Sequence, residues 1–129
     1  MALPSFTANV SIDSEGDITK SRWVGTFEIK RIITHQDRFD IEKYCKQYLA
    51  DDSSATDTLR NRQVALAELR VRVLRGPSWW EATNYGLDMV DITPIYELLA
   101  KCAEASEKWH KELEEQIKNR PTVEGPSGT

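Results

Sequence analysis

The chain has 129 residues, of which 40% are hydrophobic and 29% charged, and its formal net charge is −4. This composition is typical of one soluble globular domain, and no apolar run approaches the ~20 residues that a membrane-spanning helix needs. The acidic balance argues against nucleic acid as the main partner. The amino-terminal stretch MALPSFTANVS lacks the basic-then-apolar pattern of a secretion signal, so we expect the protein in the cytoplasm or in a particle assembled there.

A β-hairpin is predicted over residues 5–31. Apolar and polar residues alternate on both sides of a polar turn that contains Gly16, and this period of two is typical of strands with one buried face. The first strand lies near the amino terminus, so one edge of the hairpin is expected to be open. Phe6 and Val10 on that strand are candidates for accepting a strand from a partner or from another copy. The alternative is that a helix or loop covers the edge.

Two helices are predicted next, over residues 35–50 and 57–75. Thr34 and Asp37 predict a cap for the first, whose apolar residues recur at helical spacing. The second carries two apolar stripes, which indicates a central helix covered on more than one side. The stripes are Leu59, Leu66, Leu69 and Val73, and Val64, Ala67, Val71 and Leu74. Residues 69–73 also fit a strand, but the pattern runs without a breaker to a Gly-Pro pair, which favours a helix.

Residues 76–93 are predicted to form an aromatic loop that leads to a third helix over residues 94–118. Thr93 is expected to cap this helix, because a Pro follows it at the first helical position. Residues 119–129 have the composition of a flexible tail. The expected fold is α+β, mainly α, with an N-terminal β-hairpin packed on three helices in a single domain over residues 1–118.

The aromatic loop contains two adjacent tryptophans, Trp79 and Trp80, followed by Tyr85. Adjacent residues on a helix or strand point in different directions, so each indole is expected to need its own burial site. Either both rings belong to the core, or one is buried and the other anchors an interface, since Trp is enriched at binding hot spots. Tyr85 and the glycine after it predict a turn that closes over the buried ring. These three residues are candidates for protein interaction.

The sequence contains no Gly-rich phosphate loop, no HExxH and no GxSxG, so we assign no catalytic, cofactor-binding or metal-binding residue and predict a non-enzymatic protein. Cys45 and Cys102 lie among apolar neighbours in helical patterns, which is typical of small buried thiols. Arginines of the second helix are candidates for phosphate contact, but their spacing spreads them around the helix. Ion pairs with nearby acids are therefore the simpler interpretation. They are Arg60, Arg62, Arg70, Arg72 and Arg75.

Four features together resemble small structural proteins of tailed bacteriophages. They are G-x-F-x-x-K-R at 25–31, the Thr-x-x-Asp cap, A-L-A-E-L-R-V-R-V at 65–73, and G-P-S-W-W followed by Y-G-L-D-M-V-D. The resemblance covers about residues 23–113. It implies a virion accessory protein, assembled in the host cytoplasm, that contacts other phage structural proteins or copies of itself. The alternatives are a cytoplasmic tail assembly chaperone and a small nucleic-acid-binding regulator that uses the Arg-rich helix.

Overall fold

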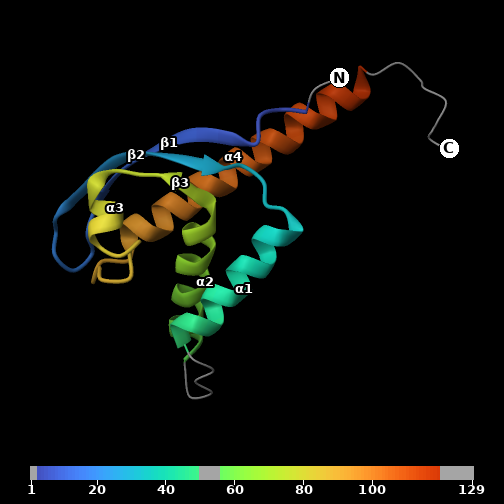
Figure 1. Cartoon of the computed structure of the whole chain (residues 1–129). Helices are drawn as coiled ribbons and strands as arrows, with labels where there is room; N and C mark the ends of the chain where they lie inside the picture. The colour runs from blue at the N-terminus through green and yellow to red at the C-terminus, as the bar shows by residue number, and fades with distance from the viewer. Residues whose placement is uncertain (1–2, 50–55, 120–129) are drawn as a thin grey trace.

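A computed structural model describes residues 3–49 and 56–119. Its elements are β1 (Thr7–Glu15), β2 (Arg22–Lys30), α1 (His35–Leu49), α2 (Asp57–Arg72), β3 (Val73–Arg75), α3 (Ser78–Ala82) and α4 (Thr93–Lys118) (Figure 1). The predicted α+β, mainly α, class is confirmed. The predicted tail over residues 119–129 lies, apart from Asn119, outside the described residues. Among the residues described, none of the helices is long and apolar enough to cross a membrane.

The three strands form one antiparallel sheet in the order β1-β2-β3. Its inner face carries Ile12, Phe27 and Ile29, which are all buried, whereas the side chains of the opposite face are largely exposed. An antiparallel sheet with one wet face needs this alternation. The predicted hairpin is therefore confirmed, and α4 packs against the inner face along β1.

The end of α2 differs from the prediction. The helix stops at Arg72, and the chain continues directly as the strand β3 instead of remaining helical to residue 75. Val73 lies opposite Ile29, and Arg75 lies opposite Glu28, with an irregularity in the register between them. The helical prediction is wrong for these three residues because pairing with the free side of β2 outweighs the local helical pattern. The hairpin thereby becomes a three-stranded sheet.

Only the C-terminal half of α2 is central. Leu69 and Ala67 are fully buried there, whereas Leu59 and Val64, nearer the start of the helix, are exposed. The first half of α2 packs against α1, and together they project away from the sheet as a helical hairpin (Figure 1). The prediction of two covered stripes is therefore wrong for this first half.

The hydrophobic core lies between the sheet, the second half of α2, α3 and the first half of α4. Its buried residues are Ile12, Phe27, Ile29, Ala65, Leu69, Trp80, Ile95, Leu98 and Cys102. Burial raises the pKa of the Cys102 thiol to about 11, so this free cysteine is a small apolar side chain at neutral pH. Cys45, on α1, is half-buried, and burial raises the pKa of its thiol as well.

Carboxylates take part in the caps of both α1 and α4. At α1, the Thr34 hydroxyl accepts a bond from the Asp37 amide while the Asp37 carboxylate accepts one from the Thr34 amide, as the sequence predicts. At α4, the predicted cap Thr93 is the first residue of the helix itself. Asp17, from the β1–β2 turn, accepts hydrogen bonds from the amides of Ile92 and Thr93 instead. The hairpin turn therefore supplies the cap of a helix that begins 76 residues later.

A second aspartate holds the same turn from the other side. The buried carboxylate of Asp91 accepts hydrogen bonds from the amides of Ile18 and Thr19, from the Thr19 hydroxyl and from the indole of Trp23. Burial by itself would raise the pKa of Asp91. The hydrogen bonds outweigh it and hold this pKa well below its ordinary range. Asp17 and Asp91 thus bind each other's segments reciprocally.

We expect Asp91→Asn to destabilise the fold at neutral pH, because the amide nitrogen would face two of the four donors and the charge would be lost. A carboxyl whose folded pKa is depressed contributes stability above its unfolded pKa, ~3.9, and loses it as pH falls through the folded value. The difference in thermal unfolding midpoint between the parent and Asp91→Asn should therefore shrink as the pH falls from 7 toward 2. Circular dichroism melts measure it.

Asp88→Asn is the matched control, because Asp88 is exposed on the same loop. Its unfolding midpoint should stay close to that of the parent protein. Equal midpoints for the Asp88 and Asp91 variants at pH 7 would contradict the structural role of Asp91.

Candidate protein-interaction surface

The short helix α3 carries both tryptophans. Trp80 is buried and Trp79 is half-buried, and Phe27 of β2 lies against both. Its ring centroid is 5.6 Å from that of Trp79 and 5.8 Å from that of Trp80, with near-perpendicular planes. The two indoles thus share Phe27 as a neighbour, whereas their other contacts differ, with Trp79 against Trp23 and Trp80 against Tyr85.

Trp79 also covers the part of β2 that lies beyond β3. Its indole N–H donates a hydrogen bond of 3.0 Å to the carbonyl oxygen of Val24, and its ring packs edge-on against Trp23 at 5.0 Å. Both indoles are therefore engaged within the fold, and Trp79 keeps part of its surface in solvent.

Tyr85 closes the aromatic cluster through a left-handed turn. Asn84, Tyr85 and Gly86 have φ values of 54°, 58° and 87°. The Tyr85 ring then lies 6.2 Å from Trp80, and the guanidinium of Arg70 stacks 3.6 Å from the centroid of the tyrosine ring. The predicted turn over the buried indole is therefore present.

The outer edge of β1, on the side away from β2, carries backbone groups that do not pair within the sheet. The Asp13 amide donates a hydrogen bond of 3.2 Å to Glu97 of α4, so it points away from β2. Backbone groups of alternate residues point to the same side, which directs the N–H and C=O groups of Asn9 and Ser11 to this outer edge as well. The hydroxyls of Ser11 and Thr26 lie 2.9 Å apart across the strands, as expected for a closely spaced pair that does not exchange backbone bonds.

Side chains close both ends of this edge. At one end, the Ser5 hydroxyl accepts a bond from the Thr7 amide and donates to the Thr7 carbonyl. At the other end, the Thr93 hydroxyl donates to the carbonyl of Glu15 at 2.8 Å, beyond the capped amide of Asp13. The backbone groups between these ends are left for another partner.

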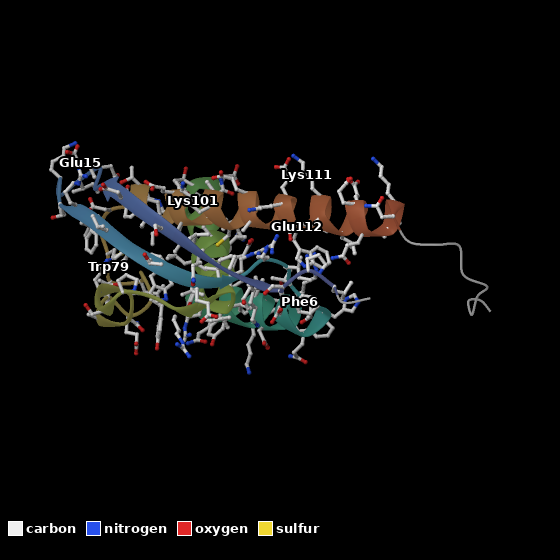
Figure 2. All side chains as sticks on the ribbon, turned by 90° about the horizontal axis from the view of Figure 1, so that it is seen from above. Phe6, Glu15, Trp79, Lys101, Lys111 and Glu112 are labelled. Carbon is white, nitrogen blue, oxygen red and sulfur yellow. The ribbon has the colours of Figure 1, made fainter. Side chains whose placement is uncertain are left out.

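A groove of about 410 Å³ lies beside this middle stretch, between β1 and α4. It is lined by residues 8–11, by Arg31, and by Lys101, Glu104, Ala105 and Lys108. Viewed from above, α4 runs along the outside of β1, with Lys101 beside the strand (Figure 2). No hydrogen bond from the described part of the chain reaches the outward groups of Asn9 and Ser11. The groove therefore exposes an unpaired strand edge.

The two predicted edge residues lie in different places. Val10 lines the groove, half-buried against the core. Phe6 precedes β1, is 46% exposed, and packs edge-on against Trp109 with ring centroids 6.1 Å apart. The aromatic cluster of Trp79 and Trp80 covers β2, which lies on the side of β1 opposite to its open edge. The candidate residues therefore form two separate surfaces, one at the edge of β1 and one over β2.

The arginines mainly join elements. Arg72 is buried and donates to Glu68 at 2.7 Å and to the carbonyl of Lys30 at 2.9 Å. Arg75 pairs with Glu28 at 3.6 Å. Ion pairing thus holds these two side chains, as the spacing predicts.

Arg31 is a further buried arginine, which the sequence analysis did not single out. It donates to the carbonyls of Ala105 and Ser5, and its Nη2 lies 3.0 Å from Glu112 as an ion pair. Arg31, which follows β2, thus joins α4 to the segment that precedes β1.

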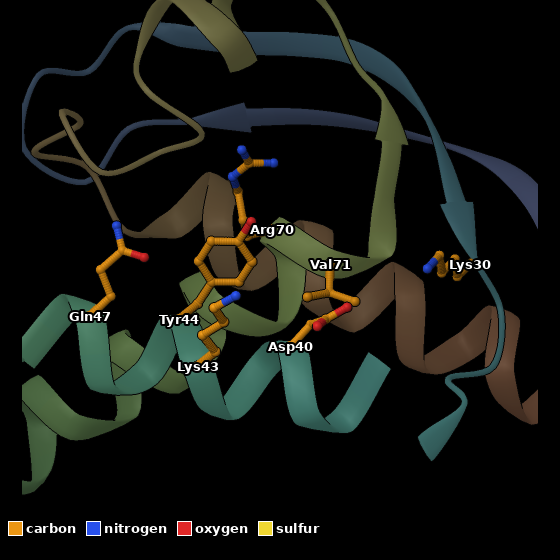
Figure 3. A pocket seen from close by; sticks show the side chains of 7 residues that line it. All are labelled: Lys30, Asp40, Lys43, Tyr44, Gln47, Arg70 and Val71. Atoms are coloured by element: carbon orange, nitrogen blue, oxygen red, sulfur yellow. The ribbon is translucent and has the colours of Figure 1, made fainter. Parts of the chain in front are cut away.

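A polar hollow of about 450 Å³ lies between α1, α2 and the end of β2 (Figure 3). Its lining includes Lys30, Lys43, Tyr44 and Arg70. Lys30 pairs with Asp37 at 2.7 Å, and Arg70 is stacked on a tyrosine ring, so two of these three cations serve the fold. Within residues 3–49 and 56–119, no cluster of three His, Cys, Asp or Glu side chains could hold a metal ion.

Burial by itself would raise the pKa of Asp37, but hydrogen bonds from Lys30 and Thr34 outweigh it and lower that pKa. The carboxylate beside the hollow is therefore ionised and paired at neutral pH. The lowered pKa agrees with the ion pair that Asp37 forms with Lys30.

Comparison with protein-family models, curated proteins and solved structures finds no match for this chain. The candidate surface is therefore defined by its geometry. Asn9 and Ser11 are functional candidates that the sequence analysis did not name, although an open edge on the first strand was one of its two expectations. Lys101 and Lys108 were also missed, because only the fold brings α4 beside β1.

Proposed function

We propose that this chain is a non-enzymatic assembly protein of a tailed bacteriophage, a virion accessory component that acts through protein–protein contacts. One observation carries the proposal: the edge of β1 is closed at both ends but presents unpaired backbone groups at Asn9 and Ser11. An open strand edge is a template for pairing with another polypeptide. The resemblance of residues 25–31 and 65–73 to phage structural proteins supports the particle as the place where this pairing occurs.

The use of buried charge within the fold also supports a structural role. Asp91, Arg31 and Arg72 each bind groups on a different element of the chain. These interactions hold the hairpin, α2 and α4 together. A rigid body of this kind presents its free edge in a constant orientation, which suits repeated contacts in a particle.

Mass spectrometry of gradient-purified virions should detect this polypeptide at a constant copy number relative to the other structural proteins. If it is instead a tail assembly chaperone, it will be absent from mature particles and will co-purify with a structural protein from infected cells before assembly. Absence from both the particles and the assembly intermediates would contradict the proposal.

A further inference from the structure

We infer that the groove between β1 and α4 binds a single acidic, extended segment of a partner polypeptide, which adds to the sheet as a fourth strand beside β1. The inference rests on the proposed function, because it names the kind of partner that the free edge takes. It is carried by three features of the groove: the free backbone groups, the small residue at its floor and the two lysines on its wall.

The backbone groups set the length of the segment. Asn9 and Ser11 present two N–H and two C=O groups to the groove, ~6.8 Å apart along the strand. The bonds of Ser5 to Thr7, and of Glu97 to the Asp13 amide, close the edge on either side. A partner therefore has room to pair over about five residues.

The floor of the groove accepts an apolar side chain. Val10 and Ala105 line it, and both are hydrophobic residues packed against the core. The short side chain of Ala105 leaves space above α4. Alternate residues of an added strand point to the same face, so one partner residue facing inward is expected to rest on Ala105.

The wall of the groove selects negative charge. Lys101 and Lys108 flank Ala105 at helical spacing, about 10.5 Å apart along α4. Neither forms an ion pair within the described part of the chain. Glu97, which stands four residues before Lys101, bonds to the Asp13 amide instead.

The α4 residues that line the groove include one acid, Glu104, and two lysines, Lys101 and Lys108, so this wall has a net positive charge. Carboxylates two residues before and after the apolar residue of a strand would lie on the same face and within reach of the two lysines. The partner pattern is therefore acidic-x-apolar-x-acidic.

The position of α4 favours a lone strand over a second copy. The helix runs along the outside of β1 (Figure 2). If two copies paired through β1, each would bring its own α4 into the space beneath the other's strand. A separate extended segment avoids this overlap.

The probes are three peptides, acetyl-TETXTET-amide with Ala, Val or Leu at X, titrated into the isotope-labelled full chain. At least one should shift the amide resonances of Asn9 and Ser11 and slow their hydrogen exchange. The same peptide with both Glu replaced by Lys should bind about tenfold more weakly. A version N-methylated at every residue should not bind, because it lacks the backbone donors on both of its edges.

Charge reversal at both lysines, K101E with K108E, should weaken binding of the acidic peptide by about tenfold or more. K111E is the matched control, since Lys111 lies on the same helix but points away from β1 (Figure 2) and pairs with Glu107. Thermal melts of both variants should match the parent protein, which shows that the effect lies in binding.

Four results would overturn the inference. One is the absence of any shift at Asn9 and Ser11 with all three peptides at millimolar concentration, and another is equal binding of the N-methylated peptide. A third is tighter binding after removal of residues 120–129, which would identify the chain's own tail as the occupant. The last is dimerisation that Ser11→Pro abolishes, which would identify a second copy. None of these affects the virion analysis, so the two proposals fail separately.

Discussion

Replacing Trp80 by alanine is expected to destabilise the fold by about 3–5 kcal/mol, the range for removal of a large buried aromatic ring. Trp80 is 3% exposed and is packed against Phe27 and Tyr85 at 5.8 and 6.2 Å between centroids. The cavity would lie between Phe27 of the sheet and the left-handed turn at Tyr85. Equilibrium unfolding in urea measures the loss.

Trp79→Ala should cost less, because this indole is only half-buried. Trp79→Phe is the informative companion, since it keeps an aromatic ring but removes the hydrogen bond to the Val24 carbonyl. It should lower stability by about 0.5–1.5 kcal/mol. Equal losses for alanine at both positions would contradict the placement of Trp80 as the buried ring and Trp79 as the partly exposed one.

Leu69→Ala is expected to lower the free energy of unfolding by about 2–5 kcal/mol. Leu69 is fully buried on the central half of α2, within the core that joins the sheet to α4. Val64→Ala, on the projecting half of the same helix, removes an exposed side chain and should change stability by less than about 0.5 kcal/mol. A cost below about 1 kcal/mol for Leu69→Ala would contradict the central position of this half of the helix.

The elements that could be predicted are those whose local pattern and tertiary surroundings agree. The alternation through the hairpin shows the burial of one sheet face, and the reciprocal bonds of Thr34 and Asp37 form between near neighbours in the chain. The left-handed turn at Gly86 follows from a residue type that favours it. None of these features depends on knowing which distant segment lies nearby.

β3 and the cap of α4 could not be predicted in this way. Residues 73–75 fit a helix locally, and they form a strand because β2 offers unpaired groups at that position. Thr93 fits a cap locally, but Asp17 accepts the hydrogen bonds of the helix amides instead, because the hairpin turn lies over the start of α4. In both cases a long-range hydrogen bond decides between two locally acceptable structures.

The candidate site likewise combines a feature that the sequence indicates with features that only the fold decides. Alternating apolar and polar residues are enough to indicate a strand with one buried face, because the side-chain period is a property of the sequence. Which groups stay open depends on contacts with residues about 80 positions away, such as those of Asp13 with Glu97 and Glu15 with Thr93. Packing of α4 along β1 closes one end of the edge, and the local bonds of Ser5 close the other. Asn9 and Ser11 stay free between the two ends, and two lysines of α4 lie beside them. Hydrophobic burial of the α4 face against the sheet is the force that makes this arrangement, and it acts only in the folded chain.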